Sequence, residues 1–417
     1  MVQKMKAIVV GAGITGVSSA LWLQHAGCDV VLIDRVAPGD PSQTSYGNAG
    51  LLARCAVIPV ATPGLLRKLP SMVFDPMQPL FLRLRYLPKL LPWAVPFLKS
   101  GAEPRMKEIA ASLNNLTFDT VEQHRAISNG TAAAQFVREG AYTYLYNDRD
   151  AMLADEKYHQ MRSLLGSRTQ PRDRAYLETT DPELSPRYQA GMEFPDHGWI
   201  TDPAAYVAAL ARHFVAEGGV MQQAEVSDIA ADGEGGIVHL TDGSQIAGDR
   251  IVLAAGVWSR KLAERFGHKV NMESERGYHL MLRGTNVRPP HPYMIAEGKF
   301  AVTPMADGIR FAGTVEMAGL DAPPSEKPFA MLERYINRVY PNLTYERADR
   351  WMGHRPSTSD SLPLLGASPK APQIIFAFGS QHIGLTIGPR LGRVVADIAT
   401  GMEMNTDLSA YRVDRFD

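Results

Sequence analysis

The stretch that decides the fold is "VVGAGITGVSSALWLQHAGCDVVLIDR", residues Val9 to Arg35. The apolar run Ala7 to Val10 just before it predicts a strand buried on both faces of a parallel sheet. A glycine-rich turn follows, then a helix over Val17 to His25 and an apolar strand over Asp29 to Ile33, which ends at Asp34. An acid about 20 residues beyond the glycines, in this order of elements, is the pattern of a Rossmann-like dinucleotide-binding unit.

Each part of this pattern has a physical role. Gly11 permits a tight turn, Gly13 lets a pyrophosphate approach the backbone, and Gly16 lets the helix pack closely on the strand. The positive end of the helix dipole would face the phosphates, and Asp34 would accept hydrogen bonds from a ribose. A glycine turn in another kind of α/β protein is the alternative, and the motif does not separate FAD from NAD.

The loop that follows, "VAPGDPSQTSYGNAGLL" over residues 36–52, favours FAD. Ser42, Thr44 and Ser45 could contact a pyrophosphate, and the small residues Gly47 to Gly50 could lie against a flat ring system. An extended FAD needs such a second contact loop more than a nicotinamide cofactor does. A plain surface turn is the alternative interpretation.

Three later segments resemble pieces of the same nucleotide-binding domain. Residues 202–219 predict an amphipathic helix with Asp202 as N-cap, and residues 250–267 predict a buried strand that turns into a helix. In residues 374–401, a strand leads through glycines to a helix expected to begin at Pro389. If the start of that helix faces a flavin, its dipole would stabilise the negative charge of the reduced ring; a routine helix entry is the alternative.

Composition limits the remaining classes. The chain has 417 residues, is 45% hydrophobic and carries a formal net charge of -1, which predicts two soluble domains and gives no basic surface for nucleic acid. Cys28 and Cys55 form neither a disulfide framework nor a metal pair, and the histidine spacings match no metal site. The start of the chain lacks the features of a signal peptide, so we expect a cytoplasmic location.

The chain resembles the D-amino acid oxidase superfamily, and within it the FAD-dependent D-amino acid dehydrogenase family. The resemblance rests on the stretches "VVGAGITGVSSALWLQHAGCDVVLID", "GNAGLL", "ATPG", "DPAAYVAAL", "VLAAGVWS", "ERGYHL", "VTPMADGIRFAGTVEMAG", "WMGHRPSTSDSLPLLG" and "HIGLTIGPRLGRVVADI". It implies an α/β fold, α+β overall, with a discontinuous Rossmann-like FAD-binding domain and a substrate domain built on a large antiparallel sheet. The FAD-binding domain would comprise residues 1–62, 199–266 and 351–417, and the substrate domain residues 63–198 and 267–350.

The resemblance also implies the reaction. The family oxidises an amine carbon beside a carboxylate by hydride transfer to flavin N5, and water converts the imino acid to a 2-oxo acid. Arg355 matches the family's carboxylate-binding position, where a planar guanidinium can donate two parallel hydrogen bonds. Tyr278 matches its substrate-side tyrosine, and His382 lies in the glycine loop expected to face the flavin. A structural arginine and a half-buried strand tyrosine are the alternatives, and Arg276 and Arg310 are candidates for a second cation.

We expect FAD to be bound noncovalently, because neither cysteine lies in a segment that resembles the family's flavin-linkage sites. The expected cofactor-binding residues are Gly11, Gly13, Ile14, Thr15, Gly16, Asp34, Arg35, Thr44, Ser45, Gly47, Asn48, Ala49, Gly50, Leu51, Val226, Ala255, Gly256, Trp258, Gly379, His382, Ile383, Gly384, Leu385 and Thr386. The substrate would be a small amine that carries a carboxylate. An oxygen-using oxidase of the glycine or sarcosine type and a non-catalytic FAD- or NAD-binding protein remain alternatives.

Residues 65–99 differ from the rest of the chain, since they are apolar, aromatic and basic with Asp75 as their single acid. Prolines and charges interrupt this segment before the roughly 20 apolar residues that a membrane-spanning helix needs. It could lie on an anionic membrane surface, which would bring a reduced flavin near membrane quinone as the electron acceptor. The alternative is that it packs as a lid over the substrate pocket.

Overall fold

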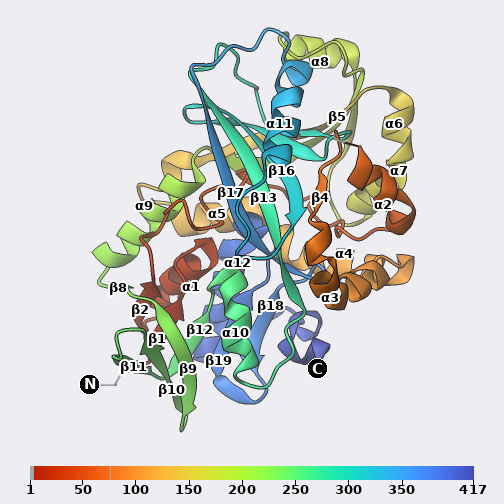
Figure 1. Ribbon diagram of the computed structural model, residues 1–417. Coiled ribbons are helices and arrows are strands. Elements are labelled where there is room, and N and C mark those ends of the chain that lie inside the picture. Colours follow the sequence, from red (N-terminus) through yellow and green to blue (C-terminus); the bar gives the residue numbers. More distant parts are fainter. Residues whose placement is uncertain (1–3, 76) are drawn as a thin grey trace.

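The Val9–Arg35 stretch forms strand β1 (Lys6–Val10), helix α1 (Ile14–His25) and strand β2 (Asp29–Asp34), as its pattern predicts. The computed structural model describes residues 4–75 and 77–417 (Figure 1). β1 pairs in parallel with β2 on one side and with β12 (Arg250–Leu253) on the other. Apolar side chains on both faces of β1 are buried, as a central parallel strand requires.

Segments that are distant in the chain complete this sheet, whose order is β18-β19-β12-β1-β2-β8. β8 (Val220–Gln223) and β19 (Ala371–Phe378) extend it in parallel, and β18 (Leu364–Ser368) pairs antiparallel with β19. Helices α1, α9 (Pro203–Ala216) and α12 (Gly384–Thr400) share a core with one face. The other face packs on helix α10 (Ser259–Glu264) and on an antiparallel sheet of β9 (Val226–Asp232), β10 (Gly235–Leu240) and β11 (Gln245–Gly248).

The prediction that the last long helix begins at Pro389 is wrong, because α12 begins at Gly384 and contains this proline. A proline inside a helix lacks the N–H that would bond the carbonyl four residues earlier, here Leu385. The buried ring of His124 supplies the missing donor, with its Nε2 2.8 Å from the Leu385 carbonyl oxygen. Burial lowers the pKa of His124 to about 4, so the neutral ring donates through Nε2 and accepts from the Tyr206 hydroxyl through Nδ1 at 2.8 Å.

A second, larger sheet lies above the first in the view of Figure 1 and has the order β17-β13-β16-β15-β14-β5-β7-β3. Its pairs are antiparallel except β14 with β5, and the short strand β4 with β16. This confirms the large antiparallel sheet that the resemblance implies. The strands are β3 (Leu51–Leu52), β4 (Leu80–Leu82), β5 (Val137–Tyr146), β6 (Gln170–Asp173, paired with β7), β7 (Ala190–Ile200), β13 (Met272–Arg283), β14 (Tyr293–Ile295), β15 (Phe300–Met305), β16 (Gly308–Met317) and β17 (Arg347–Thr358).

Helices surround this sheet, and α11 (Glu326–Val339) shares a core with β13 and β16. The others are α2 (Leu65–Phe74), α3 (Leu87–Ser100), α6 (Arg149–Ala154), α7 (Glu156–Leu164) and α8 (Arg174–Thr180), whereas α4 (Glu103–Thr117) and α5 (Thr120–Ser128) share the core of the first sheet with α12. Residues 351–358 lie in β17 and therefore in the larger sheet, although the sequence pattern groups residues 351–417 with the FAD-binding segments. Strand β17 ends at Thr358, and the chain then joins the first sheet again through β18.

The segment 65–99 packs against the larger sheet through its inner side. Strand β4 pairs with β16, and Trp93 donates its indole N–H to the Ser357 carbonyl oxygen of β17 at 2.8 Å. The Tyr86 hydroxyl lies 3.0 Å from the Glu273 carboxylate, and Arg83 Nε lies 3.0 Å from Glu316 Oε1. Among the described residues, no helix is long and apolar enough to cross a bilayer.

Candidate active site

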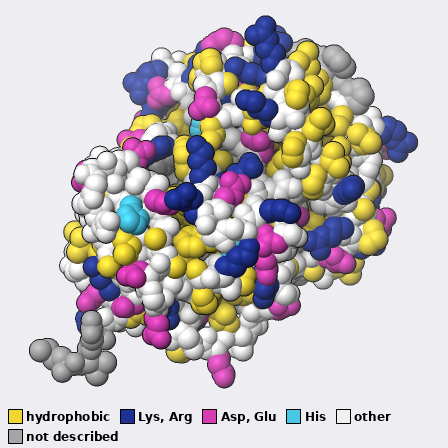
Figure 2. Space-filling view, turned by 60° about the horizontal axis from the view of Figure 1, so that its bottom comes forward, with side chains coloured by type: hydrophobic (Ala, Val, Ile, Leu, Met, Phe, Trp, Pro, Cys, Tyr) yellow, Lys and Arg dark blue, Asp and Glu magenta, His cyan; other side chains and the backbone are white. Residues whose placement is uncertain are grey.

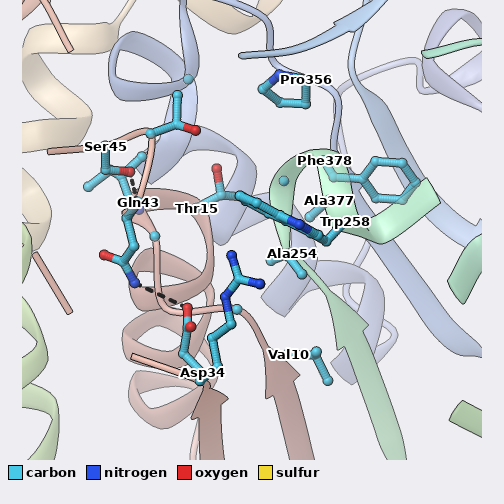
Figure 3. Close-up of a pocket in the computed structure, with 18 of the residues that line it drawn as sticks. Val10, Thr15, Asp34, Gln43, Ser45, Ala254, Trp258, Pro356, Ala377 and Phe378 are labelled. Carbon is cyan, nitrogen blue, oxygen red and sulfur yellow. Dashed lines mark hydrogen bonds between the residues drawn. The ribbon is translucent and has the colours of Figure 1, made fainter. Parts of the chain in front are cut away.

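A long pocket crosses the carboxyl ends of β1, β2, β12 and β19, where ligands bind in open parallel sheets (Figure 3). Many of the cofactor-binding residues expected from the sequence line it. They are Gly11, Gly13, Ile14, Thr15, Asp34, Arg35, Thr44, Ser45, Asn48, Val226, Ala255, Gly256, Trp258, Gly379, Gly384 and Leu385. The lining does not include Gly16, Gly47, Ala49, Gly50, Leu51, His382, Ile383 and Thr386.

The sequence pattern also missed part of the lining. Most of the missed residues are apolar neighbours of the motif residues, and no polar spacing distinguishes them in the sequence. They are Val10, Ile33, Val36, Gln43, Ala224, Glu225, Ser227, Ala254, Lys261, Leu262, Pro356, Ala377, Phe378, Ser380 and Gln381.

The three motif glycines have different surroundings. Gly11 has a φ of +104°, and a Cβ there would lie 2.5 Å from the Ala254 carbonyl oxygen of the neighbouring strand. A Cβ on Gly16 would lie 1.7 Å from the Gly11 carbonyl oxygen, so Gly16 serves helix packing. At Gly13, Ser45 Oγ at 3.3 Å is the single near neighbour of such a Cβ within the described residues. Gly13 therefore keeps the backbone open on the side that faces the pocket.

Asp34 connects the glycine turn to the following loop. Its Oδ2 accepts hydrogen bonds from the Ala12 backbone N–H at 2.7 Å and from Gln43 Nε2 at 3.1 Å. Figure 3 shows the bond from Gln43. Ser45 Oγ accepts from the Ile14 N–H at 3.0 Å, at the start of α1. The carboxylate that the sequence assigns to a ribose thus also holds the turn in shape, and Gln43 is a site residue that no sequence motif indicated.

Trp258 gives the pocket lining a flat aromatic surface. The guanidinium carbon of Arg35 lies 4.4 Å from the centroid of the Trp258 ring, which places a cation over its face. Asp34 at the end of β2 and Val226 at the start of β9 line the same pocket. A flat heterocycle with an attached ribose would find stacking and hydrogen-bonding partners here.

The larger sheet holds the loop 41–50 against this pocket. Trp351 of β17 donates its indole N–H to the Pro41 carbonyl oxygen at 2.7 Å and stacks on the His279 ring of β13 with 5.0 Å between ring centroids. A Cβ on Gly47 or on Gly353 would lie 2.1 Å from the Trp351 ring. Gly47 therefore makes room for the indole.

Two buried side chains fix the same loop through its carbonyl groups. Arg310 of β16 donates from Nη1 to the carbonyl oxygens of Tyr46 (3.2 Å) and Asn48 (2.5 Å). Burial lowers the pKa of Arg310 to about 10, so the guanidinium still carries its charge at neutral pH. Burial holds the pKa of His279 well below 6.5, and its neutral ring donates from Nδ1 to the Gly47 carbonyl oxygen at 3.0 Å. Arg310 thus binds the backbone rather than serving as a second cation for a substrate.

Arg355 lies beside the pocket, on the face of the larger sheet that holds the loop. Its Nη1 donates to Glu275 Oε1 at 2.9 Å and to the Thr314 carbonyl oxygen at 3.3 Å. The guanidinium covers Gly277, where a Cβ would lie 2.5 Å from its central carbon, so only glycine leaves room for it. The side chain is 15% exposed, and no described residue accepts a hydrogen bond from Nε or Nη2.

His382 lies near this ion pair. Part of its side chain is accessible to solvent, although the surrounding protein is densely packed. Burial among these atoms lowers the pKa of His382, the charge of Glu275 raises it, and the charge of Arg355 lowers it further. The His382 carbonyl oxygen accepts from Asn48 Nδ2 at 3.3 Å, which connects the glycine loop before α12 to the loop 41–50. Arg355 thus lies close enough to His382 to affect its pKa, and the chain neighbours Pro356 and Gln381 line the pocket.

Tyr278 does not join this group, because alternate residues of a strand point to opposite faces. Glu275 and Gly277 share the face with Arg355, whereas Tyr278 packs edge-on against Phe329 of α11 with ring centroids 5.0 Å apart. The Tyr278 hydroxyl donates to Glu316 and accepts from the Ser325 N–H at 3.1 Å. Burial raises the pKa of Tyr278 to about 12.

Arg276, the other candidate second cation, lies on the same far face of β13. It is fully buried, and its Nη1 lies 2.9 Å from Glu316 Oε2. Glu316 also pairs with Arg83 of the 65–99 segment. Arg276 and Tyr278 therefore hold that segment and α11 on the sheet.

The pocket fits an extended dinucleotide such as FAD. Its lining combines an open glycine turn at the start of α1, an acid at the end of β2 and the aromatic surface of Trp258. The buried Ser380 Oγ, which belongs to another lining residue, has no hydrogen-bond partner within the described residues, so a polar ligand atom could satisfy it. Gly384, the first residue of α12, also lines the pocket and directs the positive end of that helix towards it.

Comparisons with known proteins agree with this geometry. A family model described as FAD dependent oxidoreductase matches residues 6–398. The chain is 34% identical to a D-amino-acid oxidase of Bradyrhizobium diazoefficiens, over 98% of both chains, and 29% identical to a D-amino acid dehydrogenase of Paramagnetospirillum magneticum, over 99% of both.

Solved structures show the same fold at lower identity. Glycine oxidase from Geobacillus kaustophilus aligns with a TM-score of 0.73 at 20% identity, over 99% of both chains. L-proline dehydrogenase from P. horikoshii aligns with a TM-score of 0.73 at 17% identity, over 100% of this chain and 95% of the other. The pocket, the family match and the full-length relatives together show that the chain belongs to the DAO family of FAD-dependent oxidoreductases.

Proposed function

We propose that this FAD-dependent enzyme oxidises D-amino acids, or secondary amines such as D-hydroxyproline, to imino acids that water converts to 2-oxo acids. The observation that carries the proposal is Arg355, whose Nε and Nη2 have no acceptor among the described residues and whose chain neighbour Pro356 lines the pocket. A carboxylate bound there would have its position and orientation fixed, as hydride transfer requires. The names of the relatives at 34% and 29% identity support a D-amino acid as the substrate.

In this proposal each residue of the site has a limited task. FAD, when bound, supplies the hydride acceptor. Asp34, Gly13 and the start of α1 would hold its nucleotide half, and the start of α12 would stabilise negative charge on its ring. Noncovalent binding is supported by the two cysteines, since Cys28 and Cys55 are buried and lie outside the pocket lining.

The substrate side is assigned to Arg355 and His382. Arg355 binds the carboxylate, and His382, neutral at pH 7 because its pKa is lowered, adds an accessible polar ring beside it. Tyr278 is assigned a structural role, because its hydroxyl is engaged by Glu316 and Ser325 on the far face of β13.

The first prediction concerns turnover. Anaerobic addition of a panel of D- and L-amino acids to the FAD-loaded protein should bleach the flavin absorbance with at least one D-amino acid or D-hydroxyproline. The same panel should leave free FAD unchanged. If no member reduces the bound flavin, a non-catalytic FAD-binding protein becomes the better account.

The electron acceptor is the finer part of the proposal. We propose a quinone or another non-oxygen acceptor, and an oxygen-using oxidase is the second candidate because the relative at 34% identity is named an oxidase. Oxygen uptake and reduction of a quinone-like dye, measured on one preparation, separate the two. Stoichiometric peroxide at a rate that matches substrate consumption would contradict the dehydrogenase.

The second prediction concerns Arg355. Arg355→Ala should raise the KM for amino acid substrates about a hundredfold, since it removes a charged two-bond contact, and should leave FAD content unchanged. Steady-state kinetics and the flavin-to-protein absorbance ratio measure the two effects. The control is Arg347→Ala on the same strand, because Arg347 is exposed and pairs with Asp349 away from the pocket. An unchanged KM would remove Arg355 from the substrate site.

We also propose that the outer side of the 65–99 segment contacts an anionic membrane surface. The exposed fractions of Leu66, Leu84, Leu91 and Val95 are 66%, 73%, 58% and 47%. Exposed cations lie along the same segment, and Figure 2 shows hydrophobic side chains gathered on the right of the molecule with Lys and Arg among them. Such a surface suits the interface of an anionic bilayer, while the inner side of the segment covers the larger sheet.

The third prediction tests this contact. Replacing Leu84 and Leu91 together by serine should reduce co-sedimentation with vesicles that contain anionic lipid, because each leucine loses apolar area available for the interface. FAD content and turnover with a soluble dye should stay at the wild-type level. Vesicles of neutral lipid serve as the control. Equal sedimentation of the variant and the wild type would end the proposal of a membrane contact.

A further inference from the structure

The proposed carboxylate-binding arginine already holds an internal carboxylate. Glu275 of β13 lies directly opposite Arg355 of β17 in the strand register, and the pair is joined at 2.9 Å. The Glu275 side chain is 7% exposed, and its second oxygen accepts from Ser357 Oγ at 3.0 Å. A buried carboxylate is therefore fixed beside the place where the proposed function needs a substrate carboxylate.

The two carboxylates do not compete for the same nitrogen. Glu275 and the Thr314 carbonyl oxygen both accept hydrogen bonds from Nη1 of Arg355. The edge formed by Nε and Nη2 has no acceptor among the described residues. A ligand carboxylate can accept two parallel hydrogen bonds from this edge while Glu275 stays in place. Glu275 thus orients the guanidinium and leaves its open edge for the ligand.

The pair has little net charge, which changes the ligand that it favours. A simple carboxylate at the open edge is attracted by Arg355 and repelled by Glu275. A zwitterion can place its carboxylate on Arg355 and its ammonium group towards Glu275, so both charges are matched. Near this pair, burial and Arg355 lower the pKa of His382, so at neutral pH that ring adds no positive charge.

We infer that Glu275 is a specificity-determining residue, which makes the site select zwitterionic amino acids over simple carboxylates, including the 2-oxo acid product. This inference rests on the proposed function. Oxidation of the amine and hydrolysis of the imino acid remove the cationic group from the ligand, so Glu275 disfavours the product that remains. The residue also positions Arg355, through the hydrogen bond to Nη1.

The test compares two ligand classes on the FAD-loaded enzyme. Propionate and pyruvate are titrated anaerobically, with the shift of the flavin spectrum as the readout of Kd. The KM is measured for the D-amino acid that reduces the flavin fastest. In Glu275→Gln, which keeps an acceptor for Arg355, the Kd of propionate and of pyruvate should fall about tenfold and the amino acid KM should rise about tenfold.

Two further variants separate charge from structure. Glu273 lies two residues before Glu275 on the same strand and accepts from the Tyr86 hydroxyl. Glu273→Gln should therefore leave unchanged the ratio of the propionate Kd to the amino acid KM. Glu275→Asp keeps the charge and should retain most of the discrimination, even if Glu275→Gln loses FAD or stability. An Asp variant that binds propionate as tightly as the Gln variant would contradict the role of charge.

The outcomes also separate this inference from the proposed function. A wild-type enzyme whose flavin no amino acid reduces would contradict the proposed function, whereas the propionate and pyruvate titrations would still report the effect of Glu275. The inference would be overturned, and the proposed function left intact, if the wild-type enzyme oxidises D-amino acids and Glu275→Gln does not change the ratio. The ratio is the Kd of propionate or pyruvate divided by the KM of the D-amino acid.

Discussion

The shape of the cofactor pocket depends on the contacts that hold the loop 41–50 between the two sheets. This loop contains no helix or strand up to Leu51, so its position is set by partners on either side. Gln43 and Ser45 connect it to the first sheet through Asp34 and the start of α1. Arg310 of the larger sheet donates to two of its carbonyl groups. A buried charged donor between two carbonyls fixes a loop firmly, because leaving those groups without partners is costly.

It follows that the cofactor pocket and the substrate side form one assembly. Trp351 and His279 bind the loop from β17 and β13, the same two strands that carry Arg355 and Glu275. Because successive side chains of a strand point to opposite faces of the sheet, the two faces of β13 and β17 have different roles. One face holds the loop and the candidate substrate site, whereas the other packs on α11 and carries Glu316, which pairs with Arg83 and Arg276.

Local features of the fold could be predicted from the sequence, since short-range spacing determines them. The glycine turn, α1 and β2 follow from such spacing, and Asp202 does cap α9 by accepting from the Ala205 N–H. The start of α12 could not be predicted, because the carbonyl that Pro389 leaves without a donor is bonded by His124, which is distant in the chain. Long-range contacts of this kind leave no periodic signal.

The site was predictable to a similar extent. Many of the motif residues line the pocket, but the side of β13 on which Tyr278 lies depends on the register of the larger sheet. The pair Glu275–Arg355 and the contact of Gln43 with Asp34 also depend on tertiary structure, so no motif marks them. Arg310 is a further example, because the sequence does not show that its side chain is buried and donates to backbone carbonyl groups instead of facing a substrate.

The FAD affinity of an Arg310→Ala variant tests most directly the claim that the larger sheet holds the cofactor loop. Titration of apoprotein with FAD, followed by flavin fluorescence, should show a Kd raised about tenfold or more, because two hydrogen bonds from a charged donor are lost. Arg347→Ala should bind FAD like the wild type, since Arg347 is exposed at the far end of β17. A folded Arg310→Ala protein with wild-type FAD affinity would contradict the account.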